Sequence, residues 1–234
     1  MSTEVAALAL GDDALVLSHR LAEWAGNAPV LEEEVALANL ALDLLGQARA
    51  LLTLVGDEDE LAYGREAGAF RNLRLVEQPN GDFAHTVVRQ LFFSTWQELL
   101  YGRLAEGSSA LAPLAAAALP ETAYHRDHAV TWTLRLGDGT AESHRRTRRA
   151  VAELWPFTAE LFQPVPGLTE VDWPGLRRAW TAEVTSALTA ATLAPPPVPA
   201  PLPGSRRAGD HSPHLDGVLS TMRHLHRAHP GATW

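Results

Sequence analysis

The feature that most constrains the fold of this chain is the helical spacing of its apolar residues. Across residues 5–25, Leu8, Leu15, Leu21 and Trp24 recur at intervals that favour one side of a helix. Alternating apolar and polar runs bounded by hairpin turns, which are typical of β-strands, are nearly absent from the sequence. The pattern therefore predicts an all-α protein.

Breaks in this pattern divide the chain into helices. We expect helices over residues 5–25, 31–55, 83–105, 110–136, 141–162, 174–193 and 213–229. Asp82 is expected to cap the third helix, and Gly137 is expected to end the fourth at its C′ position. Pro120 should kink or split the fourth helix, because proline lacks an N–H group. Residues 56–82 predict an acidic loop with short helical pieces, and residues 195–203 predict an extended, exposed proline-rich segment.

The number and length of these helices predict one domain. A chain of 234 residues can bury a substantial core. We expect a four-helix bundle over about residues 5–136 and a C-terminal helical extension over about residues 140–234, together forming a single domain over residues 1–234. The longer link between the second and third helices indicates a crossover of the ferritin-like kind.

Composition excludes several classes of protein. The net charge of -9 argues against a general nucleic-acid binder and against binding to anionic membranes. The chain contains no cysteine, which excludes disulfides, thiolate metal sites and thiol catalysis, and which fits a reducing cytoplasm. We see no stretch that approaches the ~18 apolar residues of a membrane span, and no secretion signal at the N-terminus. We therefore expect a cytoplasmic protein with neither nucleic-acid nor membrane partners.

A ferritin-like bundle can hold a di-iron centre, so we searched the sequence for its ligands. Such a centre uses one Glu from each of two helices and a Glu-x-x-His pair from each of the other two, because residues three apart share a helix face. No glutamate of this chain is followed by histidine three positions later. The nearest formal match, Asp82 with His85, falls at a helix start, where Asp82 already has a capping role. The sequence therefore predicts no metal site and no catalytic residue in this chain.

Some positions nevertheless resemble an altered metal centre. Asp43 is followed by Gly46 where a histidine would be needed, and Glu121 is followed by Tyr124, with His125 one step late. Two interpretations stay open: a relic of a metal centre or a polar core network on the one hand, and side chains facing solvent or a partner on the other. The positions concerned are Asn39, Asp43, Gly46, Glu121, Tyr124 and His125. We expect Asp43 to be buried and paired, with His125, His128 or an arginine as its partner.

The remaining histidines and the tryptophans carry weaker signals. His211, His214, His224, His226 and His229 predict scattered surface histidines in preference to a zinc or nickel site. The seven tryptophans fit anchoring in the core or in interfaces. We find no nucleophile elbow, phosphate-binding loop or dinucleotide-binding fingerprint.

Several long blocks of the sequence resemble one family. These blocks, GDDALVLSHRLAEWAGNAP, LALDLLGQAR, LVEQPNGDFA, ELWPFTAELF, LRRAWTAEV and HLDGVLSTMRHLHRAHPGATW, follow one another along nearly the whole chain. They are similar to the PaaC family, whose members are components of phenylacetyl-CoA epoxidase (phenylacetate-CoA oxygenase). Pro120, directly before Glu121, departs from the pattern expected of that family.

The resemblance implies a ferritin-like fold and a role in aerobic phenylacetate breakdown. In that enzyme a related catalytic subunit holds the di-iron site and oxidises phenylacetyl-CoA with oxygen and with electrons from NADPH, and the PaaC protein is its structural partner. We therefore expect no cofactor in this chain, a di-iron centre in the catalytic partner, contacts with further subunits of the complex, and self-association when the chain is alone.

Two alternatives remain at the level of sequence. One is a metal-dependent oxidase of the ferritin-like class with unorthodox ligands such as Asp43, Glu98, Glu121 and His125. The other is a helical interaction module without any link to oxygenase chemistry. Iron content separates the first from a structural subunit, and co-purification with a di-iron protein excludes the second.

Overall fold

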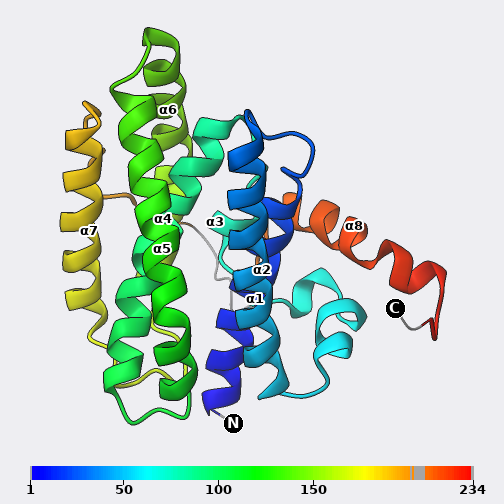
Figure 1. Cartoon of the computed structure of the whole chain (residues 1–234). Helices are drawn as coiled ribbons and strands as arrows, with labels where there is room; N and C mark the ends of the chain where they lie inside the picture. Colours follow the sequence, from blue (N-terminus) through cyan, green and yellow to red (C-terminus); the bar gives the residue numbers. More distant parts are fainter. Residues whose placement is uncertain (1, 201, 203–208, 233–234) are drawn as a thin grey trace. The chain divides into compact units, whose positions relative to one another are not determined.

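The computed structural model describes residues 2–200, 202 and 209–232, and its described residues are helical without any strand (Figure 1). The prediction of an all-α protein is confirmed. Three short elements supplement the α-helices: the π-helix η1 (Glu60–Gly64) and the 3-10 helices η2 (Ala67–Ala69) and η3 (Trp155–Phe162). The α-helices are α1 (Ser2–Ala22), α2 (Leu31–Thr53), α3 (Arg74–Glu77), α4 (Phe83–Glu106), α5 (Ala112–Gly137), α6 (Ala141–Leu154), α7 (Trp173–Ala190) and α8 (His214–Ala228).

The chain divides into two compact units. The middle unit comprises residues 1–3 and 80–203, and the terminal unit comprises residues 4–79 and 204–234. These boundaries differ from the expected division into a bundle and an extension near residues 136–140, because α4 and α5 pack with the helices that follow them. The prediction of a single domain stays a prediction, and each unit is described separately below.

The middle unit is built on the hairpin of α4 and α5, which lie side by side (Figure 1). Helices α6 and α7 pack against this hairpin. Aromatic rings fill the space between α4, α7 and η3, with ring centroids 5.5 Å apart for Phe92 and Trp155 and 5.6 Å apart for Trp155 and Trp180. The indole Nε1 of Trp180 donates a hydrogen bond of 2.9 Å to the carbonyl oxygen of Phe92, so this large ring is buried without an unpaired donor.

Helix ends in the middle unit follow local sequence signals, with two corrections. Asp82 caps α4, as predicted, and accepts a 3.0 Å hydrogen bond from the backbone N–H of His85. Helix α5 is not split at Pro120 but continues through it to Gly137. Gly137 is the last residue of α5 and not its C′ residue. A Cβ atom at this position would lie 2.3 Å from the carbonyl oxygen of Ala191, so glycine allows a close backbone approach.

The helix predicted over residues 141–162 is shorter than expected. Helix α6 begins with a capping box in which Thr140 and Ser143 bond each other's backbone N–H, and it ends at Leu154. The chain then continues as the 3-10 helix η3, because Pro156 cannot donate an i→i−4 hydrogen bond. The proline-rich segment forms no helix or strand over its described residues and is mostly exposed there.

The terminal unit contains the antiparallel pair α1 and α2, the irregular segment 54–79, and α8 (Figure 1). Gly11 of α1 allows close packing, since a Cβ atom there would lie 3.1 Å from the side chain of Leu52 and 3.3 Å from that of Leu51. The acidic loop with short helical pieces is confirmed as η1, η2 and α3. Helix α8 packs on all three of these pieces.

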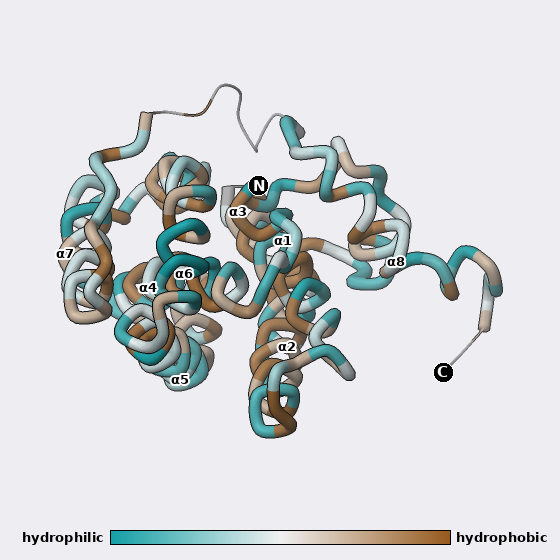
Figure 2. Tube along the Cα trace, turned by 90° about the horizontal axis from the view of Figure 1, so that it is seen from above, coloured by the Kyte–Doolittle hydropathy of each residue, from teal (hydrophilic) through white to brown (hydrophobic). Residues whose placement is uncertain are grey.

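Helix α2 is apolar on more than one side, as the predominance of brown along it shows in Figure 2. By length and composition Leu31–Thr53 is apolar enough to cross a membrane, although 44 % of its most apolar stretch is buried. Our expectation that no stretch approaches a membrane span in length and apolar character was wrong. The first turn of α2 carries Glu32, Glu33 and Glu34, and its inner side is buried in the protein, so the signal is one that core helices of proteins without membrane spans also give.

Candidate functional site

The positions that resemble an altered metal centre on α2 do not form a buried group. Asn39 and Gly46 are exposed, and Asp43 is half-buried. The buried side of α2 is formed by other residues, among them Leu37, Leu40 and Leu44. Our expectation that Asp43 is buried was therefore wrong: the flanking leucines that suggested burial divide between two sides of the helix.

The corresponding positions on α5 face different environments. Glu121 is half-buried, the Tyr124 side chain is 54 % exposed, and His125 is 1 % exposed. Helix α5 belongs to the middle unit, whereas α2 belongs to the terminal unit. Within each unit, therefore, only part of the altered motif faces the interior, and the interpretation of the six positions stays a prediction.

Among the described residues, no group of three or more His, Asp or Glu side chains could hold a metal ion. Glu98, which we considered as an unorthodox ligand, instead lies 2.9 Å from Nη1 of Arg126 on α5, and the same nitrogen lies 3.3 Å from Glu183 on α7. Burial raises the pKa of Glu98, and Arg126 opposes that shift. This arrangement joins three helices and offers no free carboxylate pair.

A buried polar network in the terminal unit was not predicted from the sequence. Asp12 and Asp13 of α1 are 0 % and 1 % exposed. Asp12 binds the guanidinium of Arg65 through both carboxylate oxygens and accepts a 2.8 Å hydrogen bond from the backbone N–H of Arg71. Asp13 accepts a 2.6 Å hydrogen bond from the backbone N–H of Leu73. Two adjacent carboxylates thus hold the irregular segment 65–73 against α1.

Glu77 of α3 is the second centre of this network. Its carboxylate is fully buried and accepts hydrogen bonds from the Asn72 amide at 2.9 Å and from the backbone N–H of Ser212 at 2.7 Å. The ring of His211 lies against the same carboxylate. Arg20 of α1 donates to the carbonyl oxygen of Glu77. The segment preceding α8 is therefore attached to α1 and α3 through polar contacts.

The contacts of His211 correct one prediction. We expected the five C-terminal histidines to be scattered on the surface, but the side chain of His211 is only 6 % exposed. His214, His224, His226 and His229 are exposed, as expected, although His226 stacks on Tyr63 with ring centroids 4.8 Å apart. A signal was present in the sequence: two adjacent aspartates in the apolar pattern of α1 require buried partners elsewhere in the chain.

The network is structural in its geometry. Its carboxylates are bound to backbone N–H groups, arginines and an imidazole, and burial raises the pKa of Asp12 while the hydrogen bond and charge of Arg65 oppose the shift. The arrangement orders segments 65–73 and 211–214.

The outer side of α2 is the surface of the terminal unit that most resembles an interface. Exposed apolar residues recur on it at alternating steps of four and three: Leu31, Val35, Ala38, Leu42 and Leu45. Leu31 is 72 % exposed, Leu42 is 64 % exposed and Val35 is 54 % exposed. A helix that is apolar on two sides is normally covered on both, and a contiguous exposed apolar stripe marks a contact with another protein.

Comparison with known proteins identifies the family. Residues 4–234 match the model of a family described as phenylacetic acid catabolic protein. The chain belongs to the phenylacetic acid catabolic protein family. Its all-helical structure, with helix over 73 % of the described residues, agrees with the ferritin-like helical bundle fold of this family, and the predicted fold class is confirmed.

One relative in the phenylacetic acid catabolic protein family is similar along nearly its whole length. The chain is 45 % identical over 241 residues to the C subunit of the 1,2-phenylacetyl-CoA epoxidase of Escherichia coli strain K12. The similarity covers 97 % of this chain and 97 % of the relative. The resemblance stated from the sequence blocks is confirmed. The first of those blocks contains Asp12 and Asp13, the two carboxylates that hold segment 65–73.

Proposed function

We propose that this chain is a non-catalytic, structural subunit of a multicomponent phenylacetyl-CoA epoxidase, acting in the cytoplasm in aerobic phenylacetate degradation. In this role it pairs with a di-iron catalytic subunit and supports it. The observation that carries the proposal is the 45 % identity over 97 % of both chains with a protein named as the C subunit of such an enzyme. Similarity along nearly the whole length of both chains favours the same place in a homologous assembly.

The donor groups of the chain support a role without catalysis. Asp43 and Glu121 lack a histidine three positions later, and the side chain that follows Glu121 at this spacing, Tyr124, is exposed. Carboxylates that are buried, such as Asp12, Asp13 and Glu77, are held by hydrogen bonds within the terminal unit. Iron-dependent chemistry in the assembly would therefore belong to the partner subunit.

The exposed stripe on α2 supports a role in pairing. A stripe with alternating steps of four and three is the pattern with which one helix packs along another. Burying side chains such as Leu31 and Leu42 would remove apolar surface from water, which is the main driving force of stable association. We propose that a helix of the catalytic subunit covers this stripe, and that in its absence a second copy of the chain does so.

Co-expression with the cognate catalytic subunit tests the proposal. We expect a stable complex by size-exclusion chromatography with light scattering, with iron in the complex and far less than one iron per chain in this protein purified alone. Leu42→Asp should weaken the complex at least roughly tenfold, because an apolar contact at the centre of an interface is replaced by a charge. Leu225→Asp, at a leucine of α8 that is 57 % exposed, is the matched control.

Three results would contradict the proposal or one of its parts. Near-stoichiometric iron linked to activity in the isolated chain would favour a metal-dependent oxidase with unorthodox ligands. A clean monomer at high concentration, without affinity for the catalytic subunit, would remove the basis for a supporting role. Equal effects of the α2 and α8 variants would mean that the stripe on α2 is not the contact surface.

A further inference from the structure

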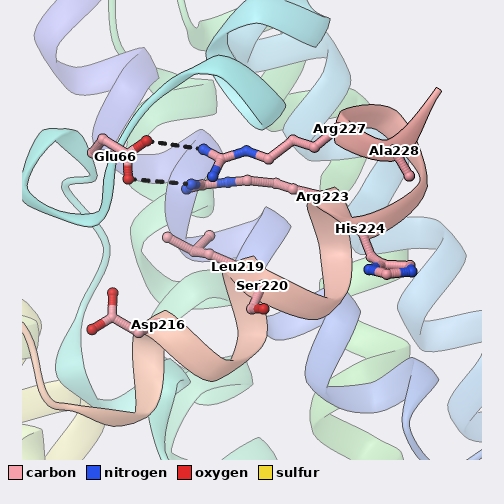
Figure 3. Close-up of a pocket in the computed structure, with 8 residues that line it drawn as sticks. All are labelled: Glu66, Asp216, Leu219, Ser220, Arg223, His224, Arg227 and Ala228. Atoms are coloured by element: carbon pink, nitrogen blue, oxygen red, sulfur yellow. Dashed lines mark hydrogen bonds and ion pairs between the residues drawn. The ribbon is translucent and has the colours of Figure 1, made fainter. Parts of the chain in front are cut away.

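Two arginines on consecutive turns of α8 lie beside a surface cavity of the terminal unit. Arg223 and Arg227 line this cavity, whose volume is about 470 Å³, together with Ser220 and with Glu66 from the segment before η2 (Figure 3). A cavity of this size lies within the range of small-molecule binding sites, which is roughly 300–1,000 Å³. Every residue that lines it belongs to the terminal unit.

The guanidinium of Arg223 is buried without sufficient acceptors. The residue is 3 % exposed, and its Nε and Nη2 atoms are buried and have no hydrogen-bond acceptor among the described residues. Its nearest carboxylate contact is a 3.8 Å ion pair between Nη1 and Oε2 of Glu66. The guanidinium carbon of Arg223 also lies 5.7 Å from the centroid of the Phe70 ring. Buried donors of this kind normally have partners.

The charges around the cavity are unbalanced. Glu66 is the carboxylate in ion-pair contact with Arg223 and Arg227, and its other oxygen lies 2.9 Å from Nη2 of Arg227. Arg65 is also nearby, but its guanidinium is bound to Asp12. Burial lowers the pKa of Arg223 and the charge of Arg227 lowers it further, while the charges of Glu66 and Asp216 oppose this shift. Asp216 lies apart from the guanidinium groups in Figure 3.

Glu66 holds its position weakly. Its side chain is 81 % exposed, so its attraction to the two arginines is screened by water. Figure 3 shows its carboxylate facing both guanidinium groups at the edge of the cavity. An anion with more acceptor oxygens and more charge would replace it, because it would satisfy the donors that one carboxylate leaves without partners.

We propose that this cavity binds the phosphate group of a small molecule, which displaces the carboxylate of Glu66 and accepts hydrogen bonds from Arg223 and Arg227. A phosphate offers three acceptor oxygens and up to two negative charges, whereas a carboxylate offers two oxygens and one charge. Ser220 provides a hydroxyl at the same cavity, and the remaining volume accommodates the rest of the ligand. This site is independent of the proposed contact surface on α2.

Calorimetric titration of the full chain with inorganic phosphate and with pyrophosphate, at constant ionic strength set by chloride, tests this site. The decisive variant is Glu66→Gln, which removes the competing carboxylate and should tighten phosphate binding by up to about fivefold. Arg227→Gln should weaken it at least roughly tenfold, because a charge-assisted hydrogen bond is lost. Arg227 is half exposed, so this variant should fold even if Arg223→Gln does not.

Arg145→Gln is the matched control. Like Arg227, Arg145 is an exposed arginine that pairs with a glutamate, in this case Glu142 of the same helix. It should bind phosphate like the unchanged protein. The proposal is overturned if the unchanged chain and Glu66→Gln respond to phosphate only as they do to chloride, or if Arg227→Gln binds phosphate unchanged. Acetate binding as tightly as phosphate would also overturn it, since the site would then accept a carboxylate of a protein segment.

Discussion

The Nδ1 atom of His211 lies 2.6 Å from Oε1 of Glu77, and the Nε2 atom of the same ring lies 3.0 Å from the carbonyl oxygen of Phe70. Both partners are acceptors, so both ring nitrogens must donate and the imidazole is protonated in this arrangement. Burial by itself lowers the pKa of His211, but the hydrogen bond and charge of Glu77 and the carbonyl of Phe70 outweigh it and raise the pKa above its usual value of 6.5.

This pair makes the terminal unit sensitive to rising pH. Because the pKa of His211 is higher in the folded state than in the unfolded state, its stabilising contribution is complete below pH 6.5 and is lost as the pH rises through the folded pKa. We expect His211→Gln to lower the free energy of unfolding by about 3 kcal/mol at mildly acidic pH, since Glu77 is left as a buried charge without its partner. Urea unfolding over a pH series measures this, with His224→Gln on α8 as an exposed control. If the free energy of unfolding depended on pH in His211→Gln as it does in the unchanged chain, the prediction would be contradicted.

His85 makes the middle unit sensitive in the opposite direction. Burial, followed by the charge of Arg89, lowers the pKa of His85 to about 4. The unfolded chain takes up a proton near pH 6.5 and the folded chain only near pH 4, so stability falls as the pH falls across this window. The loss should be roughly 2 kcal/mol, which is less than the full shift implies because solvent partly screens the ring.

Replacing His85 with leucine should reduce the loss of stability that occurs as the pH falls from 6.5 to about 4. The Nδ1 atom of His85 is buried without a hydrogen-bond partner among the described residues, so the substitution removes no hydrogen bond of that nitrogen. Urea unfolding between about pH 4 and pH 6.5 compares the variant with the unchanged chain, and His229→Leu serves as an exposed control. If the free energy of unfolding of His85→Leu fell with pH as steeply as that of the unchanged chain, another group would be responsible for the loss.

Two glycines that both lie in helices should respond in opposite ways to alanine. At Gly137 the new Cβ atom would lie 2.3 Å from a backbone oxygen of Ala191, so α5 and the end of α7 must move apart at a cost of about 1–3 kcal/mol. At Gly46 the new Cβ atom has nothing within 4 Å, and alanine should stabilise α2 by about 0.5–1 kcal/mol. Thermal unfolding of the two variants measures the difference. Stabilisation by Gly137→Ala would show that the approach of Ala191 is not tight.

Local sequence signals predicted most of the helices and several of their ends. Asp82 precedes an apolar periodic run and caps α4, and the described proline-rich residues 195–200 and 202 form no helix, because both effects act within a few residues. The end of α6 was missed because apolar spacing continues through Pro156, although proline ends the α-helical hydrogen bonding there. The role of Gly137 was missed because its neighbour, Ala191, is distant in sequence.

The polar groups were harder to predict because their partners are far apart in the chain. Asp12 binds Arg65 across 53 positions, and His211 binds Glu77 across 134 positions. Periodicity identifies which side of a helix is apolar, but it does not show which buried carboxylate meets which cation. The six altered positions were chosen by spacing alone, and spacing does not distinguish the two apolar sides of α2, which is why Asp43 was expected to be buried.

The tie between Glu77 and His211 has a consequence for synthesis on the ribosome. The segment that completes the terminal unit is translated only after the residues of the middle unit. Helices α1, α2 and α3 therefore leave the ribosome before α8 has been synthesised. During that interval the carboxylate of Glu77 lacks His211 and Ser212, and η1, η2 and α3 are not covered by α8. The half-made N-terminal region is therefore the species that a chaperone would have to protect.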